Sequence, residues 1–479
     1  MEDSLDWLLI NPRPKYSVLG DYDPLMVPFA PMGLAYLGAS LEKQGFKTAI
    51  YDCFISNQLK IEEVLRLYQP SVVGVSCLTP VMGVLPDICR LIRHYAPKTK
   101  IILGNIHATL FAKELLQKGI GDIIVQGEAE ETVVELAHCL ASAGDLSQIH
   151  GITYLDGKQV KETPHRALLN DLDQIPLPAW HLLDLNQYKT PPMFSFTKRL
   201  LPLLASRGCP FQCYFCAQNI MSPLVRKRNL VFVADEVELI YKKTGVDMFW
   251  FADAIFPLRK EDAEIFCSEI TRRGLHRKIR WITETRAELI DRPLIKMMKQ
   301  AGLFMLIFGL ESGDQTLLEW IKPGLRLEDG EEAIRAARSE RVLTLGLFML
   351  GLPGETIKSM EKTINYAKCS GLDFAKFNIA VPFPGSRFYK DVFRHAPPPL
   401  WENFSANFQS QADRHELVYT PLGINSKQLQ GWQKKAFYRF YIRPSLIYRH
   451  LFHRTISLRN MYRGGMITIK NQLIEWAIK

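Results

Sequence analysis

Short runs of β-branched and apolar residues alternate with amphipathic segments over the first 150 residues. The apolar runs, each bounded by polar residues, predict five buried strands at 6–11, 47–52, 71–76, 100–104 and 122–126. Amphipathic segments with helical spacing follow them near 31–44, 59–67, 84–96, 110–118 and 129–142. This order predicts an α/β domain with a Rossmann-like, doubly wound parallel sheet, whose ligands should lie at the carboxyl ends of the strands.

A second βα series begins after this pattern breaks. Between 151 and about 195, a hairpin pattern around Gly157 is followed by Pro176 and Pro178, which predict an extended linker. Six more strands are then predicted, with helical patterns between them, at Leu203–Ser206, Met248–Ala252, Arg280–Thr285, Phe304–Gly309, Leu345–Gly351 and Ala375–Val381. Six such units predict a partial (β/α)6 barrel of the TIM type, with its chemistry on the loops after the strands.

These patterns divide the 479 residues into a first domain (1–150), a linker (151–195), a barrel (196–396) and a mainly helical tail (397–479). No apolar run reaches the roughly 18 residues that a membrane span needs. The beginning, MEDSLDWLLINPRP, is acidic where a signal peptide would be basic. The expected location is the cytoplasm.

The net charge of +9 comes from one region of the chain. Residues 431–479 hold ten Lys and Arg but a single acid, Glu475, so the preceding part is close to neutral. A general nucleic-acid interface is therefore not expected. Aromatic residues alternate with Arg in this tail. Either they pack over the barrel while Arg stays solvated, or the tail contacts an anionic membrane surface near a lipid-like substrate.

Three of the nine cysteines lie within eight residues and form the motif C-x3-C-x2-C. They are Cys209, Cys213 and Cys216, and they directly follow the first predicted strand of the barrel. Three thiolates on one loop can hold three irons of a [4Fe-4S] cluster and leave the fourth iron open for a ligand. The alternative is a zinc site completed by a distant His, which the spacing alone allows.

With Phe215 before its last cysteine, this motif strongly resembles the signature of the radical S-adenosylmethionine superfamily. The resemblance implies that S-adenosylmethionine chelates the open iron, and that one-electron reduction cleaves it to a 5′-deoxyadenosyl radical. It also implies an electron donor such as flavodoxin or ferredoxin.

Further fragments resemble the same family at the ends of the later strands. Phe251-Ala-Asp-Ala-Ile-Phe suggests that Asp253 holds the methionine ammonium, although Ala254 replaces a second Asp; a helix cap is the alternative. Arg286 and Glu311 would contact the carboxylate and the ribose, or else form a structural ion pair. Gly351, Gly354 and Pro382 would let the backbone approach the adenine, or serve as ordinary turn residues.

The first domain resembles the cobalamin-binding domain that precedes many radical enzymes. The resemblance implies cobalamin contacts at strand ends, from Ser76, Thr79, Gly104, His107, Gly127 and Glu128. The loop after the first strand, Asn11-Pro-Arg-Pro-Lys-Tyr, departs from this pattern because it lacks a cobalt-binding histidine. Bound cobalamin is therefore expected without a protein axial ligand, and His107 is expected to line the pocket or to pack. A domain that keeps the fold without the cofactor is the alternative.

Together these resemblances imply an enzyme that functionalises an unactivated carbon of a small-molecule or lipid-like substrate, most simply by cobalamin-dependent methyl transfer. Radical-driven ring formation or rearrangement on a tetrapyrrole- or lipid-like substrate is the alternative. A cobalamin or iron–sulfur sensor without turnover is less favoured, because a sensor needs no second cofactor pocket beside its cluster. No side chain is assigned as the catalytic residue.

Overall fold

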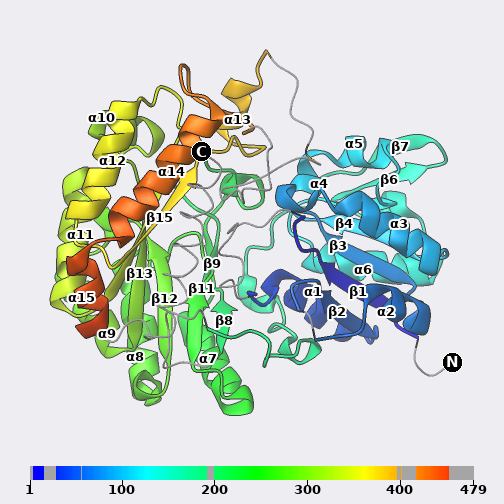
Figure 1. Ribbon diagram of the computed structural model, residues 1–479. Helices are drawn as coiled ribbons and strands as arrows, with labels where there is room; N and C mark the ends of the chain where they lie inside the picture. The colour runs from blue at the N-terminus through cyan, green and yellow to red at the C-terminus, as the bar shows by residue number, and fades with distance from the viewer. Residues whose placement is uncertain are drawn as a thin grey trace.

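The computed structural model describes residues 4–15, 28–55, 57–190, 199–395, 401 and 417–452. It contains two α/β domains side by side, and the last helices pack against the second domain (Figure 1). The aromatic and basic stretch for which packing or membrane contact is expected falls partly on residues 453–479, which lie outside the described residues. Within those that are described, no helix has the length and apolar character needed to cross a membrane.

The first domain is built on a sheet with the order β2-β1-β3-β4-β5-β6-β7. Its first five strands are parallel, and they confirm the predicted doubly wound pattern: β1 (Trp7–Asn11), β2 (Thr48–Asp52), β3 (Val72–Ser76), β4 (Lys100–Gly104) and β5 (Ile123–Val125). The helices between and after them are α1 (Met32–Glu42), α2 (Ile61–Tyr68), α3 (Leu85–Tyr95), α4 (Ile106–Leu110), α5 (Ala112–Gln117) and α6 (Glu130–Ala141).

The hairpin around Gly157, predicted as part of the linker, extends this first sheet. Strands β6 (Ile152–Asp156) and β7 (Gln159–Glu162) are antiparallel to each other, and β6 pairs antiparallel with β5. The linker therefore begins after Glu162 instead of at 151. A hairpin pattern predicts its own turn, but the strand that it pairs with is decided by tertiary structure.

The second domain has a fully parallel sheet with the order β15-β14-β13-β12-β11-β8. Its strands are β8 (Leu200–Leu203), β11 (Met248–Phe251), β12 (Arg280–Thr285), β13 (Leu303–Glu311), β14 (Leu343–Leu350) and β15 (Phe374–Ile379). The helices that follow them are α7 (Leu230–Thr244), α8 (Lys260–Arg272), α9 (Arg292–Gln300), α10 (Gln315–Ile321), α11 (Leu327–Ser339), α12 (Ile357–Cys369) and α13 (Arg387–Val392). This is the predicted partial barrel of six βα units.

The predicted first strand of the barrel was wrong by three residues. Strand β8 ends at Leu203, where the predicted strand began. The backbone N–H of Ala205 donates to the carboxylate of Asp253, with distances of 3.0 and 3.2 Å to its two oxygens, so the chain leaves the sheet there. A run of apolar residues in the sequence does not show where a side chain from another strand accepts a backbone hydrogen bond and so ends the strand.

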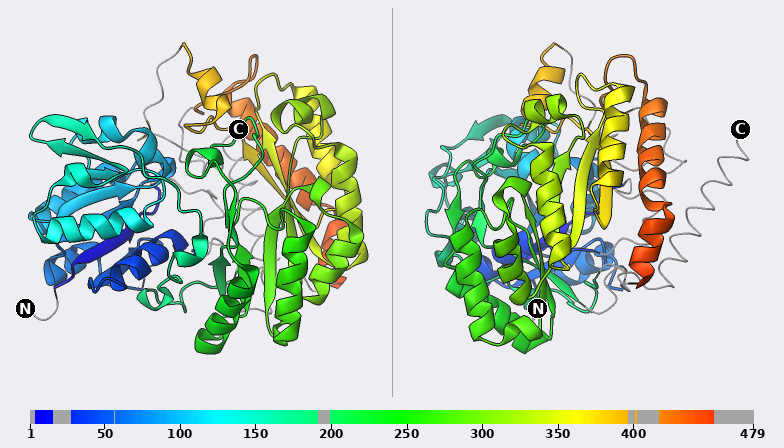
Figure 2. Two further views of the ribbon diagram at one scale, coloured as in Figure 1. Left: turned by 180° about the vertical axis from the view of Figure 1, so that it is seen from behind. Right: turned by 90° about the vertical axis from the view of Figure 1, so that its left-hand side faces the viewer.

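The two faces of the second sheet have different neighbours. Phe249, Phe251 and Trp281 point to the outer face, where they pack in one core with residues of the surrounding helices. Ile282 and Phe374 point to the inner face and belong to a smaller apolar cluster. The helices lie around the outside of the sheet in Figure 2. The inner face is therefore the side that the helices leave accessible.

The first part of the tail covers the edge strand β15. Helix α14 (Ser426–Tyr441) runs beside it and is followed by α15 (Pro444–Phe452). The hydroxyl of Tyr441 bonds both the N–H and the carbonyl of Ala375, at 3.1 and 2.9 Å, and Gln433 donates to the carbonyl of Phe377. These contacts satisfy backbone groups that an open edge would expose. This part of the tail thus packs over the barrel.

Candidate active site

The cysteine loop begins at a glycine that no other residue could replace without strain. Gly208 has φ +92°, and a Cβ built on it would lie 2.2 Å from the carbonyl oxygen of Leu224. Short antiparallel strands β9 (Ser206–Arg207) and β10 (Arg226–Lys227) flank the loop on either side. The loop carrying the three cysteines is therefore closed at its base and held in one conformation.

Two of the predicted residues, Cys213 and Arg286, meet at this loop. Arg286 Nη1 lies 3.9 Å from the sulfur of Cys213, and its guanidinium lies 3.9 Å from the centre of the Phe211 ring. Burial raises the pKa of the Cys213 thiol, while the positive charges of Lys322 and Arg286 oppose that shift. These two cations would favour a thiolate, the form that binds iron. Arg286 thus lies next to Cys213 and also pairs with Glu288, while its contact with the carboxylate of S-adenosylmethionine stays a prediction.

Glu311 lies at the end of β13 in a strained conformation. Its φ is +57°, and it is 7% exposed. Lys322, which also donates to the carbonyl of Gly309, lies 3.4 Å from its carboxylate. A side chain on Gly309 would collide with both groups, since each lies 2.5 Å from the position of the missing Cβ. A non-glycine residue held at positive φ is typical of a binding site.

Two other residues that are predicted to contact S-adenosylmethionine, Asp253 and Gly351, contact groups of the protein in this structure. Asp253 is buried, accepts from Ala205 and Ser206, and has a pKa raised by burial to about 7. Gly351 has φ +90°, and the space of its missing Cβ is filled by Leu429 of α14. The close approach predicted for adenine is made here by Leu429. Their roles toward the cofactor stay predictions.

The remaining three predicted residues are placed as follows. Phe215 packs at the margin of an apolar cluster that includes Tyr214 and Phe388. Gly354 has φ +75° and open space at its missing Cβ. Pro382 is buried in the loop after β15. In the same loop, the missing Cβ of Gly385 would lie 2.7 Å from Ile220, so this loop packs against the cysteine loop.

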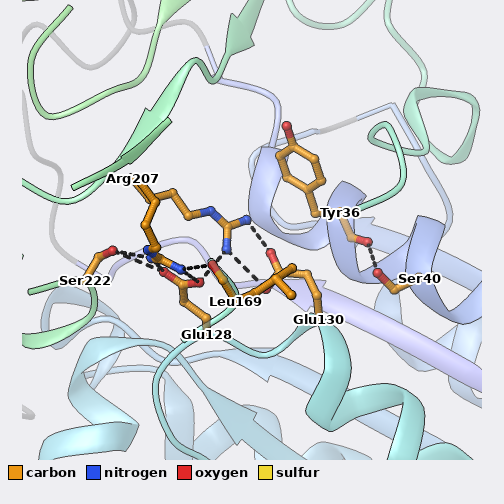
Figure 3. A network of polar contacts seen from close by, with 8 residues as sticks. Tyr36, Ser40, Glu128, Glu130, Leu169, Arg207 and Ser222 are labelled. Carbon is orange, nitrogen blue, oxygen red and sulfur yellow. Dashed lines mark hydrogen bonds and ion pairs between the residues drawn. The ribbon is translucent and has the colours of Figure 1, made fainter. Parts of the chain in front are cut away.

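An ion-pair network joins the cysteine loop to the first domain (Figure 3). Arg207 of β9 pairs with Glu128 at 3.0 Å and also with Glu130. Arg226 of β10 pairs with the same Glu128 and donates to the carbonyl of Leu169 at 2.7 Å. Burial alone would raise the pKa of Glu128, but the two arginines bring it below its usual value. Glu128 was predicted to contact cobalamin, and in this structure its carboxylate binds the arginines.

The predicted cobalamin residues gather at the carboxyl ends of β3, β4 and β5. Asn105 donates to Ser76, the Thr79 hydroxyl lies 3.1 Å from Nδ1 of His107, and Gly127 donates to Thr109. Gly104 ends β4, and Gly127 has φ +70° with open space at its missing Cβ. This edge has the location and the mixture of hydroxyls and glycines that fit a ligand of a doubly wound sheet.

His107 is 1% exposed and packs between two aromatic rings. Its ring centre lies 4.6 Å from that of Phe111 and 5.7 Å from that of Trp401. Burial lowers its pKa to about 4, so the ring is neutral near pH 7. These contacts favour the packing role for His107 over that of a cobalt ligand.

Four functional residues were missed by sequence reasoning. Arg207 and Arg226 form the network between the domains, and Glu130 and Lys322 pair with Arg207 and Glu311. Arg207 lies two residues before the cysteine motif and Glu130 two residues after Glu128, so each stands beside a predicted residue. Arg226 and Lys322 lie 98 and 11 residues from their partners and carried no such signal.

The three cysteines offer the donor set that a [4Fe-4S] cluster requires. They come from one loop, and burial raises the pKa of Cys216 as it does that of Cys213. Cys209 and Cys213 are partly exposed and Cys216 is exposed, so the loop can present the three sulfurs to a bound group, and the cations beside Cys213 fit a thiolate there. Among the residues that the structure describes, no three His, Cys, Asp or Glu side chains are grouped to hold a single metal ion.

Comparisons with known families divide the chain in the same way as the structure. Residues 27–137 match the family described as the B12 binding domain. Residues 203–367 match the radical SAM superfamily. The first match falls within the first sheet and its helices, and the second runs from the end of β8 into α12.

Similar proteins cover most of the chain. An uncharacterized methyltransferase of Pyrococcus horikoshii is 28% identical over 91% of this chain and 93% of its own length. An anaerobic magnesium-protoporphyrin IX monomethyl ester cyclase of Cereibacter sphaeroides is also 28% identical, over 91% and 71%. The radical S-adenosylmethionine methyltransferase TsrM of Kitasatospora setae, solved with cobalamin and a [4Fe-4S] cluster, has a TM-score of 0.70 at 18% identity over 92% of this chain and 90% of that one. This last likeness concerns the fold.

Proposed function

Since the chain is a radical SAM protein with an N-terminal B12-binding domain, we propose that it transfers a methyl group to an unactivated carbon in a biosynthetic pathway. The observation that carries this proposal is the ion-pair network of Glu128, Arg207 and Arg226. It holds the cysteine loop of one domain against the ligand-binding edge of the other. Two cofactors bound at these places would lie on facing parts of one site.

Each group of residues would have its own role in such a site. Cys209, Cys213 and Cys216 would hold the cluster, and Arg286 beside Cys213 would neutralise the carboxylate of S-adenosylmethionine. Glu311, held by Lys322, would accept hydrogen bonds from ribose hydroxyls. When bound, the cluster and S-adenosylmethionine supply an electron and a radical, and cobalamin supplies the methyl group. Ser76, Thr79, Gly104 and Gly127 would contact cobalamin at the strand ends.

A reaction of this kind needs an electron from outside the chain. We propose a small donor such as flavodoxin or ferredoxin, and a cytoplasmic location, where such donors and reduced thiols are found.

In the tail, Arg449 donates to the carbonyl of Gly371, and His450 contacts the carbonyl of Asp373. These two residues therefore face the barrel and are not expected to contact a membrane.

Ring formation is the second candidate function. It is supported by the cyclase of Cereibacter sphaeroides, which is as similar to this chain as the methyltransferase of Pyrococcus horikoshii. The two candidates differ in the mass of the product. Methyl transfer adds one CH2 to the substrate, whereas ring formation removes hydrogen without adding carbon.

The test is anaerobic incubation of the reconstituted enzyme with a reductant, S-adenosylmethionine labelled in its methyl group, and cell extract. We expect 5′-deoxyadenosine, S-adenosylhomocysteine and a product that carries the label. A product that has lost hydrogen and carries no label would support ring formation. Absence of 5′-deoxyadenosine from enzyme with a full complement of iron and cobalamin would contradict both.

A further inference from the structure

Four polar side chains on the inner face of the second sheet have polar atoms without a hydrogen-bond or ion-pair partner among the described residues. They are Trp250 on β11, Glu284 on β12, and Lys376 and Asn378 on β15. Nε1 of Trp250 and Oδ1 of Asn378 are buried without a hydrogen bond among the described residues. Glu284 and Lys376 are partly buried, and neither forms a hydrogen bond or an ion pair within that same part of the chain. Polar groups buried in this way cost free energy unless a ligand binds them.

The two charged residues are separated by three strands and do not pair with each other in this structure. Lys376 is in register with Leu347, and Leu347 with Gly309, whereas Glu284 is in register with Ile307. They are thus three strands apart, on the order of 14 Å of backbone at about 4.8 Å per strand. Burial lowers the pKa of Lys376, and the charge of Glu284 opposes that shift. A ligand between them would lie in the field of both.

The surface between these two charges is apolar. Along β14, the inward positions Leu345, Leu347 and Met349 are partly exposed, whereas the outward positions are buried under the helices. Ile307 of β13 belongs to the same inner apolar cluster. Trp250 adds an aromatic surface, and the ring of Phe29 from the first domain lies 5.0 Å from it. This face suits a molecule with an apolar body.

Of the two charged residues, only Lys376 is set back from the residues predicted for S-adenosylmethionine. Glu284 is the penultimate residue of β12, and burial together with the charge of Glu311 raises its pKa to about 7. Arg286 lies beside Cys213, and Glu311 and Lys322 pair at the end of β13. Lys322 is paired with Glu311, whereas Lys376 on the inner face has no ion-pair partner among the described residues and can bind an anion. It lies three residues before the end of β15. A second molecule deeper in the barrel would be in reach of the cofactor without using its contacts.

We propose that this inner face binds the substrate, and that the substrate is an amphiphilic organic anion. Lys376 binds its carboxylate or phosphate oxygen, Glu284 accepts a hydrogen bond from a hydroxyl or N–H group elsewhere on the same molecule, and the residues of β13 and β14 contact its apolar body. The inference rests on the proposed function in that the bound molecule is the one to be modified. The binding itself can be measured without any turnover.

The experiment compares two pairs of probes on the reconstituted protein without reductant. Protoporphyrin IX and its dimethyl ester have the same ring but differ in charge, as do palmitate and methyl palmitate. We expect the acid of at least one pair to bind about 10-fold or more tightly than its ester, as a charge-assisted hydrogen bond would produce. The pair that shows the difference distinguishes a tetrapyrrole body from a lipid body.

Variants then assign the preference to its residue. Lys376→Met should abolish the preference for the acid, and Lys376→Arg should keep most of it. Glu284→Gln removes a negative charge near the bound anion and should leave the affinity for the acid unchanged or tighter. Lys358→Met, at an exposed position of α12, is the matched control and should behave as the wild type.

The inference would be overturned by no binding of either acid, by equal binding of acid and ester, or by a preference that Lys376→Met leaves intact. A loss in Glu284→Gln as large as that in Lys376→Met would do so too, since it would reflect a disturbed sheet instead of a lost cation. The proposed function is tested separately by formation of 5′-deoxyadenosine. A protein that binds the acid through Lys376 but never cleaves S-adenosylmethionine would refute the function alone.

Discussion

Arg207 Nη1 lies 3.0 Å from Glu128 Oε2 and ties the strand before the cysteine loop to the end of the first domain's sheet. Both side chains are about 15% exposed or less, so the pair is largely shielded from water. Arg226, which follows the loop, binds the same carboxylate. One acid of the first domain thus holds both ends of the loop that carries the three cysteines.

We therefore expect Glu128→Gln to weaken the attachment between the domains. Loss of charge-assisted hydrogen bonds to two arginines should lower the free energy of unfolding by about 2 kcal/mol. Urea unfolding followed by fluorescence measures this. The control is Glu131→Gln, whose side chain is 50% exposed and pairs only at 3.7 Å with Arg166. Equal stability of the two variants would contradict the role given to Glu128.

Changing Cys209, Cys213 or Cys216 to Ala should prevent assembly of the cluster. Each thiolate is expected to hold one iron, and no other cysteine follows within the loop. Iron and sulfide analysis after anaerobic reconstitution gives the result. Cys369→Ala, at an exposed position on the end of α12, should keep the full iron content. A brown, active Cys213→Ala protein would show that the assignment is wrong.

The stability of the first domain should depend on pH through His107. Its pKa in the folded protein is about 4, below the ordinary value of 6.5, so the unfolded chain takes up the proton first as the pH falls. The contribution of neutral His107 to the free energy of unfolding is complete above pH 6.5. It is lost as the pH falls from 6.5 to 4, and the loss is at most about 3 kcal/mol. Thermal unfolding of His107→Gln should show a flatter pH dependence, whereas the exposed His165→Gln should follow the wild type.

Cobalamin bound to this protein should have no nitrogen ligand from the chain. The loop after β1 lacks a histidine, and His107 is held by Thr79 and packed against Phe111. Electron paramagnetic resonance of the Co(II) form reveals an imidazole ligand by its superhyperfine splitting. Such a splitting in the wild type that disappears in His107→Ala would overturn this prediction.

Tyr441→Phe should destabilise the second domain. Its hydroxyl bonds both backbone groups of Ala375, and their loss should cost about 2 kcal/mol. Tyr448→Phe, at a residue that is 68% exposed, is the control in the same unfolding experiment.

A chain ending near Ser426 should lose more stability than Tyr441→Phe, because it also lacks Leu429 and Phe440. If that shorter chain were fully stable and lost only salt-sensitive liposome binding, the tail would serve a membrane.

The sequence by itself determined the two βα series, their order and the cysteine motif. All three are local signals: strand and helix periodicity extends over a few residues, and the three cysteines lie within eight. The resemblance carried by that motif also located Arg286 and Glu311, which the fold brings to the cysteine loop and its neighbour Lys322. The predicted strand boundaries were less accurate. The strand Leu200–Leu203 was predicted three residues too late, because the carboxylate of Asp253, which is distant in the sequence, ends it.

Only the tertiary structure decided which partners meet across the chain. Arg207 and Glu128 are 79 residues apart, and nothing in either segment names the other. Glu284 and Lys376 lie in strands that are far apart in the sequence, and only the strand order from β12 through β13 and β14 to β15 shows that they share the inner face. Periodicity specifies which side of a strand a residue occupies, but not which strands are neighbours. That choice comes from packing over the whole sheet, which no short stretch of sequence contains.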